Sequence, residues 1–442
     1  MNSRHYSGAA FFYNLTMNHI TEMITRRPFV RPLFLWIIGI LLYVYVPDAW
    51  LIPLLLVCWS IPLLEACVNG FGKRQALGYA SRWLSGVPVL LLLLTLSVET
   101  CYLRERYPAS AFSAWQREAA EVQSILVKRL DQLSLTDAEK SVLATLTLGY
   151  RQSMRQAVRQ QFAAAGVAHV LAVSGFHVAI VCGALSFVTF FLRHRVWGRW
   201  IRYLLLLVGL WGFAFLTGLS PSAVRAALML TFYLTGKHFG LQVDSYNTLV
   251  AAAFCMLVYR PAFLFDVGFQ LSFIAVGFIL AWMPLFRRMV IVRNPLVAYC
   301  WNGLLVALAA QMGTVGLTLY YFKQGSLLFL LTCLPISVIA TCLLPATWIW
   351  LCLPDGCLVA SMSQGCLERL THAMVRFVEC CAALPFATVQ WSCDGITLLL
   401  IYVLFGWGWL FLHQWSPKRL LGLMSLVLLL FVKIFLSLLD GN

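Results

Sequence analysis

Long apolar runs, separated by short polar or basic segments, fill most of this chain. A helix of about 20 apolar residues is long enough to cross the hydrocarbon core of a bilayer. We therefore predict an all-α polytopic membrane protein with about 12 transmembrane segments. The apolar runs lie near residues 32–46, 50–68, 83–102, 167–192, 200–217, 221–237, 244–260, 265–285, 296–322, 326–353, 394–413 and 420–438.

One long polar segment, residues 103–164, interrupts these runs and predicts soluble helices. Trp115, Ala119 and Val122 begin a series of apolar positions at three- and four-residue steps, which is typical of a helix with one apolar face. Thr136 and Glu139 match a capping box that starts a second helix.

The distribution of Lys and Arg between the spans puts the N-terminus inside the cell and the polar segment outside. Lys73, Arg74 and Arg82 are the basic residues of the first predicted cytoplasmic loop. We expect three parts: a cytoplasmic tail with three spans (1–102), an extracytoplasmic soluble helical segment (103–164) and a larger membrane domain (165–442).

Arg151, Arg155 and Arg159 are spaced four residues apart, which predicts a third helix with a basic stripe leading into the next apolar run. A solvated or headgroup-contacting face is the simpler interpretation. The alternative is a guide for phosphate groups at the mouth of a pore.

Residues 326–353 form a run that contains Pro335 and Pro345. Because proline removes a backbone donor and kinks or breaks a helix, we predict two half-length passes there. Residues 361–383 are predicted to form an interfacial amphipathic helix, with Glu368 and His372 on its polar side.

The composition supports a membrane protein. With 61% hydrophobic and 11% charged residues, the chain has too few polar side chains to cover a soluble globule. The net charge of +15 is explained first by basic loops that orient the spans, with nucleic acid as a partner the alternative. The 14 cysteines form no CxxC pair and are expected to be buried apolar residues. The polar N-terminal segment does not resemble a signal peptide, so we expect the first span to be an uncleaved anchor.

The stretch from Ala165 to Ile180 combines an apolar background with His169, Ser174, Gly175 and His177. An unpartnered polar group in hydrocarbon costs roughly several kcal/mol, so such residues usually face another helix or a watery cavity. Ser174 and His177 are three residues apart and should be neighbours on a helix. Gly166 and Gly175 would permit close packing or a local break.

Other polar residues fall inside later spans. Ser220-Pro221 predicts a helix start, with Arg225 about one and a half turns inside it. That arginine either snorkels to the surface or faces water or a carboxylate. Asp266 and Gln270 share one helix face, and Gln311 lies in mid-span, where hydrogen bonding between helices and lining a path are both open.

Several segments, in order along the chain, resemble the successive motifs of the ComEC competence proteins, inner-membrane channels for incoming transforming DNA. The segments are LATLTLGYR, AHVLAVSGFHVAI, TGLSPSAVRAALM, DSYNTLVAAAF, YRPAFLFDVGFQLSFIAV and AAQMGTVGL. The resemblance covers roughly residues 28–440. Such an ordered set is far more specific than any single motif.

The resemblance implies a helical channel domain in a multi-pass protein of the bacterial inner membrane, acting on single-stranded DNA. It also implies a cytoplasmic DNA translocase and extracytoplasmic DNA-delivery proteins as partners, with a homodimer an open alternative. The transport-path residues carried over by motif are His169, Ser174, Gly175, His177, Gly218, Arg225, Asn247, Asp266, Gln270, Ser272 and Gln311.

Two modules of many family members are missing from this pattern: a small β-barrel between early spans and a metallo-β-lactamase-like nuclease domain with an HxHxDH cluster. We expect a form without both, so that any strand degradation comes from elsewhere. No HExxH motif and no glycine-rich phosphate loop occurs, so we expect no metal, no cofactor and an energy source outside this chain.

Two other functions compete with the DNA channel. A transporter of another anionic solute would use a broken helix and Arg225 as a counter-charge. An intramembrane serine hydrolase would use Ser174, but it needs a base within hydrogen-bond reach, and no later histidine lies inside a span. We therefore expect a channel and not an enzyme.

Overall fold

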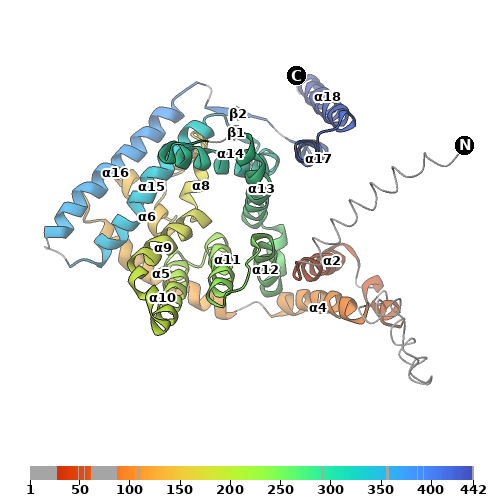
Figure 1. Ribbon diagram of the computed structural model, residues 1–442, viewed down its shortest axis with the longest axis horizontal. Coiled ribbons are helices and arrows are strands. Elements are labelled where there is room, and N and C mark those ends of the chain that lie inside the picture. The colour runs from red at the N-terminus through yellow and green to blue at the C-terminus, as the bar shows by residue number, and fades with distance from the viewer. Residues whose placement is uncertain are drawn as a thin grey trace, which may run out of the picture. The chain divides into compact units, whose positions relative to one another are not determined.

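The computed structural model describes residues 27–47, 49–53, 55–60, 87–107, 110–290, 292–354, 358–385, 387–391 and 393–440 (Figure 1). The polar N-terminal tail up to residue 26 and the basic loop with Lys73, Arg74 and Arg82 lie outside these residues. The chain divides into two compact units, which are described separately. One comprises Met1–Ala111 and Phe239–Asp266, and the other Phe112–His238 and Val267–Asn442. The predicted boundaries at residues 102 and 164 stay predictions.

The first unit packs short apolar helices against one another. Gly39 lies so close to α4 that an added Cβ would be 2.7 Å from the Cβ of Ser97, and the Ser97 hydroxyl donates to the Trp36 carbonyl over 2.7 Å. Trp36 in turn meets the ring of Phe254 edge-on, at 5.3 Å between centroids. The helices are α2 (Val30–Tyr45), Ala49–Ser60, α4 (Val87–Arg106), α12 (Ser245–Tyr259) and η4 (Pro261–Phe265).

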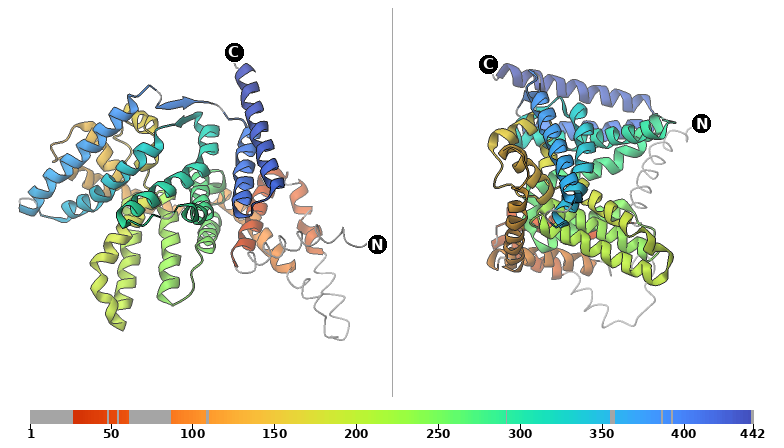
Figure 2. Two further views of the ribbon diagram at one scale, coloured as in Figure 1. Left: turned by 45° about the horizontal axis from the view of Figure 1, so that its top comes forward. Right: turned by 90° about the vertical axis from the view of Figure 1, so that its left-hand side faces the viewer.

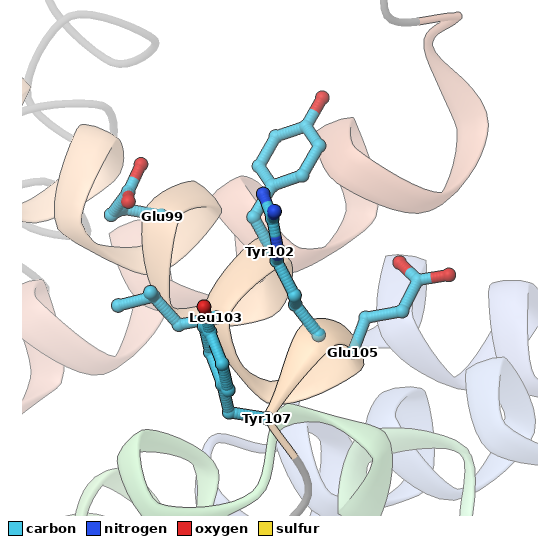
Figure 3. Close-up of a pocket in the computed structure, with 6 residues that line it drawn as sticks. Glu99, Tyr102, Leu103, Glu105 and Tyr107 are labelled. Carbon is cyan, nitrogen blue, oxygen red and sulfur yellow. The ribbon is translucent and has the colours of Figure 1, made fainter.

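A shallow pocket lies on the surface at the C-terminal end of α4. Its lining comes from that helix and the residue after it, and includes Glu99, Tyr102, Glu105 and Tyr107 (Figure 3). The Tyr43 hydroxyl donates to Glu105 from α2. None of the predicted path residues lines this pocket.

The second unit carries most of the helices, and the all-α fold class is confirmed. Its elements are α5 (Ser110–Leu130), α6 (Asp137–Leu148), α7 (Gln156–Ala164), α8 (Ala168–Leu171), α9 (Gly175–Val188), η3 (Phe190–His194), α10 (Val196–Leu216), α11 (Pro221–His238), α13 (Val267–Met289), α14 (Pro295–Phe322), β1 (Gln324–Ser326), α15 (Phe329–Cys352), α16 (Leu358–Ala382), β2 (Thr388–Gln390), α17 (Gly395–His413) and α18 (Pro417–Asp440).

Five helices in the described part of the chain are long and apolar enough to cross a membrane. They are Val196–Leu216, Val267–Met289, Val297–Phe322, Phe329–Cys352 and Gly395–His413. Further apolar helices, α2 and α9 among them, are shorter than 18 residues. The chain is therefore a membrane protein, while the predicted number of about 12 spans stays a prediction.

The largest core of the second unit joins α6 to α15 and α16. Leu143 and Leu146 of α6 pack in one buried cluster with Ile336 and Leu343 of α15 and with Leu367 of α16. The predicted capping box at Thr136 and Glu139 starts α6 as expected, and Gly149 ends it with a left-handed φ of 71°. The polar segment thus supplies a helix that is buried from Ser141 to Leu148.

The prediction of two half-length passes in 326–353 is wrong, because α15 is one helix that contains Pro335 and Pro345. Two hydroxyl groups of α15 donate to carbonyls of the same helix: Ser337 to Cys333 over 2.6 Å, and Thr341 to Ser337 over 2.7 Å. Packing against neighbouring helices lets a membrane helix continue past proline.

The predicted helix at 361–383 is present as α16, which lies beside α15 (Figure 1). Two of its polar residues bind the polar segment. Glu368 accepts a hydrogen bond from the Ser134 backbone at 2.8 Å, and His372 Nδ1 lies 2.7 Å from Glu139 Oε1. Its location at a membrane surface stays a prediction.

The ends of the α15–α16 hairpin are joined by a small antiparallel ladder. Gly325 of β1 is paired with Val389 of β2, and the flanking pairs are Gln324 with Gln390 and Ser326 with Thr388. Beyond β2, α17 and α18 form a second hairpin, in which Lys433 lies 3.3 Å from the capping carboxylate of Asp394 (Figure 2).

Candidate transport site

The chain does not run as one helix through the central apolar stretch. It passes from α7 through Gly166 to the four-residue α8, breaks at Ala172, and restarts as α9 at Gly175. Gly166 has a φ of 79°, and an added Cβ would be 2.7 Å from the Cβ of Phe329. Only glycine combines this backbone conformation with so close an approach. The local break predicted from Gly166 and Gly175 is confirmed.

Ser174 and His177 are brought together at the start of α9, as their spacing predicts. Ser174 is the N-cap residue, and its backbone N–H donates to His177 Nδ1 over 3.2 Å. The Ser174 hydroxyl lies 2.9 Å from the same nitrogen. Because Nδ1 accepts from a backbone N–H, a neutral His177 carries its proton on Nε2. His177 is fully buried, and Nε2 has no hydrogen-bond partner among the described residues.

Three hydroxyl groups from other elements satisfy the backbone around this break. Ser222 of α11 donates to the Val173 carbonyl, Ser326 to Ala164 over 2.8 Å, and Thr332 to Ala165 over 2.6 Å. Irregular backbone at membrane depth needs such partners. None of these three residues was among the predicted site residues. They could have been recognised in the sequence only as serine or threonine residues beside a helix start or inside an apolar run.

Gly218 lies at a junction where α10 ends. Its φ is 72°, and an added Cβ would be 3.2 Å from the amide nitrogen of Gln123. Gln123 is buried and donates to the Leu148 carbonyl over 2.6 Å at the end of α6. Gly149 packs equally closely, since an added Cβ there would be 3.0 Å from the Thr217 carbonyl oxygen. The role of Gly218 in the structure is therefore a tight turn against α5 and α6.

His169 lies on α8 and is exposed at the surface of the protein. Its Nε2 is 4.0 Å from the sulfur of Cys333 on α15, which itself lies 3.9 Å from the Ser337 hydroxyl. The two predicted histidines thus differ: His177 closes a helix cap, whereas His169 faces α15.

Arg225 is buried between α11 and α13, with 3% of its surface exposed. Its guanidinium lies over the ring of Phe273 at 5.2 Å and donates to the Gly268 carbonyl over 3.5 Å. An arginine packed in this way does not reach the protein surface, so the snorkelling interpretation is wrong for this structure. The neighbouring Ala226 faces α9, where it is the nearest neighbour of Gly175.

One pair of polar side chains joins α13 to α14. Gln270 accepts a hydrogen bond from the Tyr321 hydroxyl over 3.0 Å, which joins the two helices. Ser272 and Gln311 are both partly buried on the same helix pair. Thr314 donates within its own helix, to the Ala310 carbonyl.

Two predicted path residues belong to the first unit. Asn247 accepts a hydrogen bond from the Phe29 backbone over 3.3 Å, close to the ion pair of Arg27 with Asp244 at 2.7 Å. Asp244 caps α12, because its carboxylate accepts the Tyr246 N–H over 2.8 Å. Asp266 ends η4 and precedes α13.

The predicted basic stripe on one helix is wrong. The turn after Gly149 contains Arg151, and α7 begins only after Arg155, so Arg159 alone lies within a helix. Arg155 is 3.4 Å from Asp137. All three arginines are exposed, although Arg155 is paired with Asp137.

Chemically, this arrangement offers buried hydrogen-bond donors and a buried positive charge. Within the described ranges, no group of three His, Cys, Asp or Glu side chains could hold a metal ion. Ser174 and His177 form a close pair, but the nitrogen that would act as a base already accepts the Ser174 N–H. The geometry therefore favours binding and the capping of the start of α9 over nucleophilic chemistry.

Comparison with known proteins agrees with the sequence motifs. The competence-protein family model matches residues 146–415. The chain is 31% identical over 205 residues to ComE operon protein 3 of Bacillus subtilis (strain 168), which covers 46% of this chain and 25% of that protein. It is 27% identical over 156 residues to the uncharacterized protein YcaI of Escherichia coli (strain K12), and this match covers 33% of this chain and 20% of that protein. No solved structure matches.

The matched segments are thus a quarter and a fifth of the lengths of these two relatives. The family match is broader, because it takes in more than half of this chain and reaches from the end of α6 to α17. It also contains every transport-path residue that the motifs identified. The chain therefore belongs to the competence-protein family, of the ComEC type.

Proposed function

We propose that this protein forms a channel through which single-stranded DNA crosses the bacterial inner membrane during natural transformation. The observation that carries this proposal is the sign of the charges in two long stretches of the second unit. Residues 141–238 and 267–354 contain arginine and lysine but neither aspartate nor glutamate. Stretches that contain only basic residues attract a polyanion and repel cations, and Asp266 is the single acidic residue among the predicted path positions.

Arg225 supports the same function at one position. Its guanidinium is held between α11 and α13 by Gly268 and Phe273, within the residues matched by the family. Burial lowers the local dielectric and strengthens the attraction to a phosphate. In the proposed channel, His169, Gln270, Ser272 and Gln311 offer polar groups along the route. Arg225 binds a phosphate only when α11 and α13 separate enough to expose its guanidinium.

The partners proposed for this channel follow from the direction of transport. An extracytoplasmic DNA-binding protein would deliver the strand, and the exposed arginines Arg151, Arg155 and Arg159 would guide it. A cytoplasmic translocase would draw it inward and supply the energy. The channel itself needs no cofactor and catalyses no reaction, and a homodimer is compatible with the proposal.

The test measures transformation frequency in a naturally competent host. The gene for this protein is deleted there and replaced by a copy that carries Arg225→Ala. Hydrogen bonds to charged groups contribute about 1.5–3 kcal/mol. A loss of this size corresponds to roughly a ten- to hundredfold lower transformation frequency. The amount of the protein in the membrane is measured in the same cells.

Lys237→Ala is the matched control, because Lys237 is a basic residue at the exposed end of the same helix. We expect that variant to transform normally. Normal transformation by Arg225→Ala at wild-type protein levels would remove the central argument for a DNA path. In that case a carrier of small anions becomes the better explanation of the positive charges.

A further inference from the structure

A second surface of the molecule combines exposed aromatic rings with arginines. It lies where α9 meets α10 through η3, two helices that run side by side (Figure 2). We call it the α9–α10 corner, and it comprises Phe187, Phe191, Arg193, Arg195, Trp197 and Arg199. None of these residues belongs to the transport path proposed above.

The apolar side chains of this corner are unusually open. Phe187, Phe191 and Trp197 are 83%, 70% and 82% exposed. The backbone beneath them is tightly built, because an added Cβ on Gly198 would lie 2.2 Å from the Leu192 carbonyl oxygen. A rigid support that presents large rings outward is typical of a binding surface.

One arginine of the corner lies over an aromatic ring, and none of the three is paired with a carboxylate in the described part of the chain. The Arg193 guanidinium lies over the Phe190 ring at 3.7 Å. In the described part of the chain, none of Arg193, Arg195 and Arg199 forms an ion pair with an acidic side chain. Residues 141–243 contain no acidic residue at all. Their positive charge is thus available to an external anion.

The position of the corner identifies the anion. The corner adjoins the start of Val196–Leu216, one of the five helices able to cross a membrane, so it lies near a bilayer surface. Aliphatic side chains are exposed beside the rings, namely Val188, Val196 and Leu204. Aliphatic groups do not stack on nucleobases but do enter a lipid phase, which favours lipid over nucleic acid.

We propose that the α9–α10 corner binds acidic phospholipids. Arg193, Arg195 and Arg199 hold the headgroup phosphates, while Phe187, Phe191 and Trp197 enter the boundary between headgroups and acyl chains. The corner thereby fixes the depth of α9 and α10 in the membrane. This function is independent of whether DNA is the transported molecule.

The test measures the lipid that remains with the purified full-length protein. Wild type and Arg193→Gln/Arg195→Gln/Arg199→Gln are extracted from the same membranes, and bound phosphatidylglycerol and phosphatidylethanolamine are quantified by mass spectrometry. We expect the triple variant to retain roughly fivefold less phosphatidylglycerol per protein, with phosphatidylethanolamine unchanged. Trp197→Ala is expected to lower retention as well.

The matched control is Arg287→Gln/Arg288→Gln/Arg293→Gln, which removes the same charge from another basic cluster. We expect it to keep phosphatidylglycerol at the wild-type level. Equal losses in both triple variants would show a general charge effect and overturn the proposal, as would wild-type retention by the corner variant. Binding of a fluorescent oligothymidylate to the same proteins tests nucleic acid as the ligand instead. If the corner variant loses oligonucleotide binding but keeps its lipid, the surface binds nucleic acid and the proposal is wrong.

Discussion

At the scale of single residues, the pair Ser174 and His177 shows how a polar couple is accommodated in an apolar stretch. The Ser174 N–H is one of the backbone donors that a helix start leaves without a partner, and His177 accepts it. The histidine thus takes the place that glutamate has in a usual capping box. A charged residue in that place would be costlier inside a membrane than a neutral imidazole.

This cap predicts a graded response at position 174. Ser174→Ala removes the capping oxygen and should lower the free energy of unfolding by about 1 kcal/mol. Ser174→Asn retains a side-chain acceptor and should stay near the wild-type value. Thermal unfolding of both variants in the same detergent measures the difference. Equal unfolding temperatures for the two variants would contradict a capping role.

Gly166 allows a sharper prediction, because both its backbone and its surroundings exclude a side chain. Gly166→Ala places a Cβ in a left-handed conformation and against Phe329. We expect a loss of about 2 kcal/mol or more in stability. Gly183→Ala is the control, since that glycine lies in α9 with nothing within 4 Å of an added Cβ. Alanine there should be neutral or stabilising. Denaturant unfolding of both variants decides between these expectations.

At the scale of elements, helix limits followed from local signals. Ser220-Pro221 predicted the start of α11, where the Ala223 N–H now donates to the Ser220 hydroxyl over 3.4 Å. The capping box of α6 was equally readable from Thr136 and Glu139. These signals act within one turn, so no knowledge of the rest of the fold is needed.

Long-range partners could not be predicted in this way. α15 continues past both of its prolines, and its Thr332 bonds to a carbonyl of a segment 167 residues away in sequence. The same holds for Arg225, because only the contacts with Gly268 and Phe273 show which way its side chain turns. A single sequence contains the residues of the site but not the pairing between helices.

The contact between α6 and α16 predicts a dependence of stability on pH. Burial raises the pKa of Glu139, but hydrogen bonds from the Thr136 backbone, the Thr136 hydroxyl and His372 outweigh it, so the pKa lies below its usual value. Because the folded pKa is below the unfolded one, the contribution of Glu139 is present above about pH 4.3. It is lost as the pH falls through the folded value.

We therefore expect wild-type stability to fall below about pH 4 and Glu139→Gln to show a flatter profile there. Unfolding midpoints measured between about pH 3 and pH 7 test this, with the same experiment on Glu121→Gln, an exposed residue of α5, as the control. A Glu139→Gln profile that runs parallel to wild type would mean that another group is responsible.

At the scale of the whole molecule, the sign of the charges is the property that separates DNA from other cargo. A polyanion releases counterions when it binds, so its affinity falls steeply with salt, with a slope of roughly −0.7 for each phosphate contacted on a single strand. Small anions show no comparable slope, since they carry no condensed counterions.

Binding of a fluorescent single-stranded oligonucleotide to the full-length protein between about 50 and 200 mM salt measures this slope. We expect Arg225→Ala to reduce it by about 0.7, the share of one contact, and Lys237→Ala to leave it unchanged. An unaltered slope in Arg225→Ala would place that arginine away from the bound strand. Solute flux through proteoliposomes without oligonucleotide binding would favour the transporter of small anions.

The ladder between β1 and β2 has a mechanical consequence for this molecule. The strands are antiparallel, and the α15–α16 hairpin lies between them in sequence. The chain therefore enters β1 and leaves β2 at the same end of the ladder, beside the paired residues Gln324 and Gln390. Tension applied there loads the backbone bonds one after another, as in a zipper, and each contributes only about 1 kcal/mol. A pull along the chain thus separates β1 from β2 one hydrogen bond at a time, before it can remove the buried face of α15 from the core. We expect the ladder to open at low force while the α15–α16 hairpin stays folded.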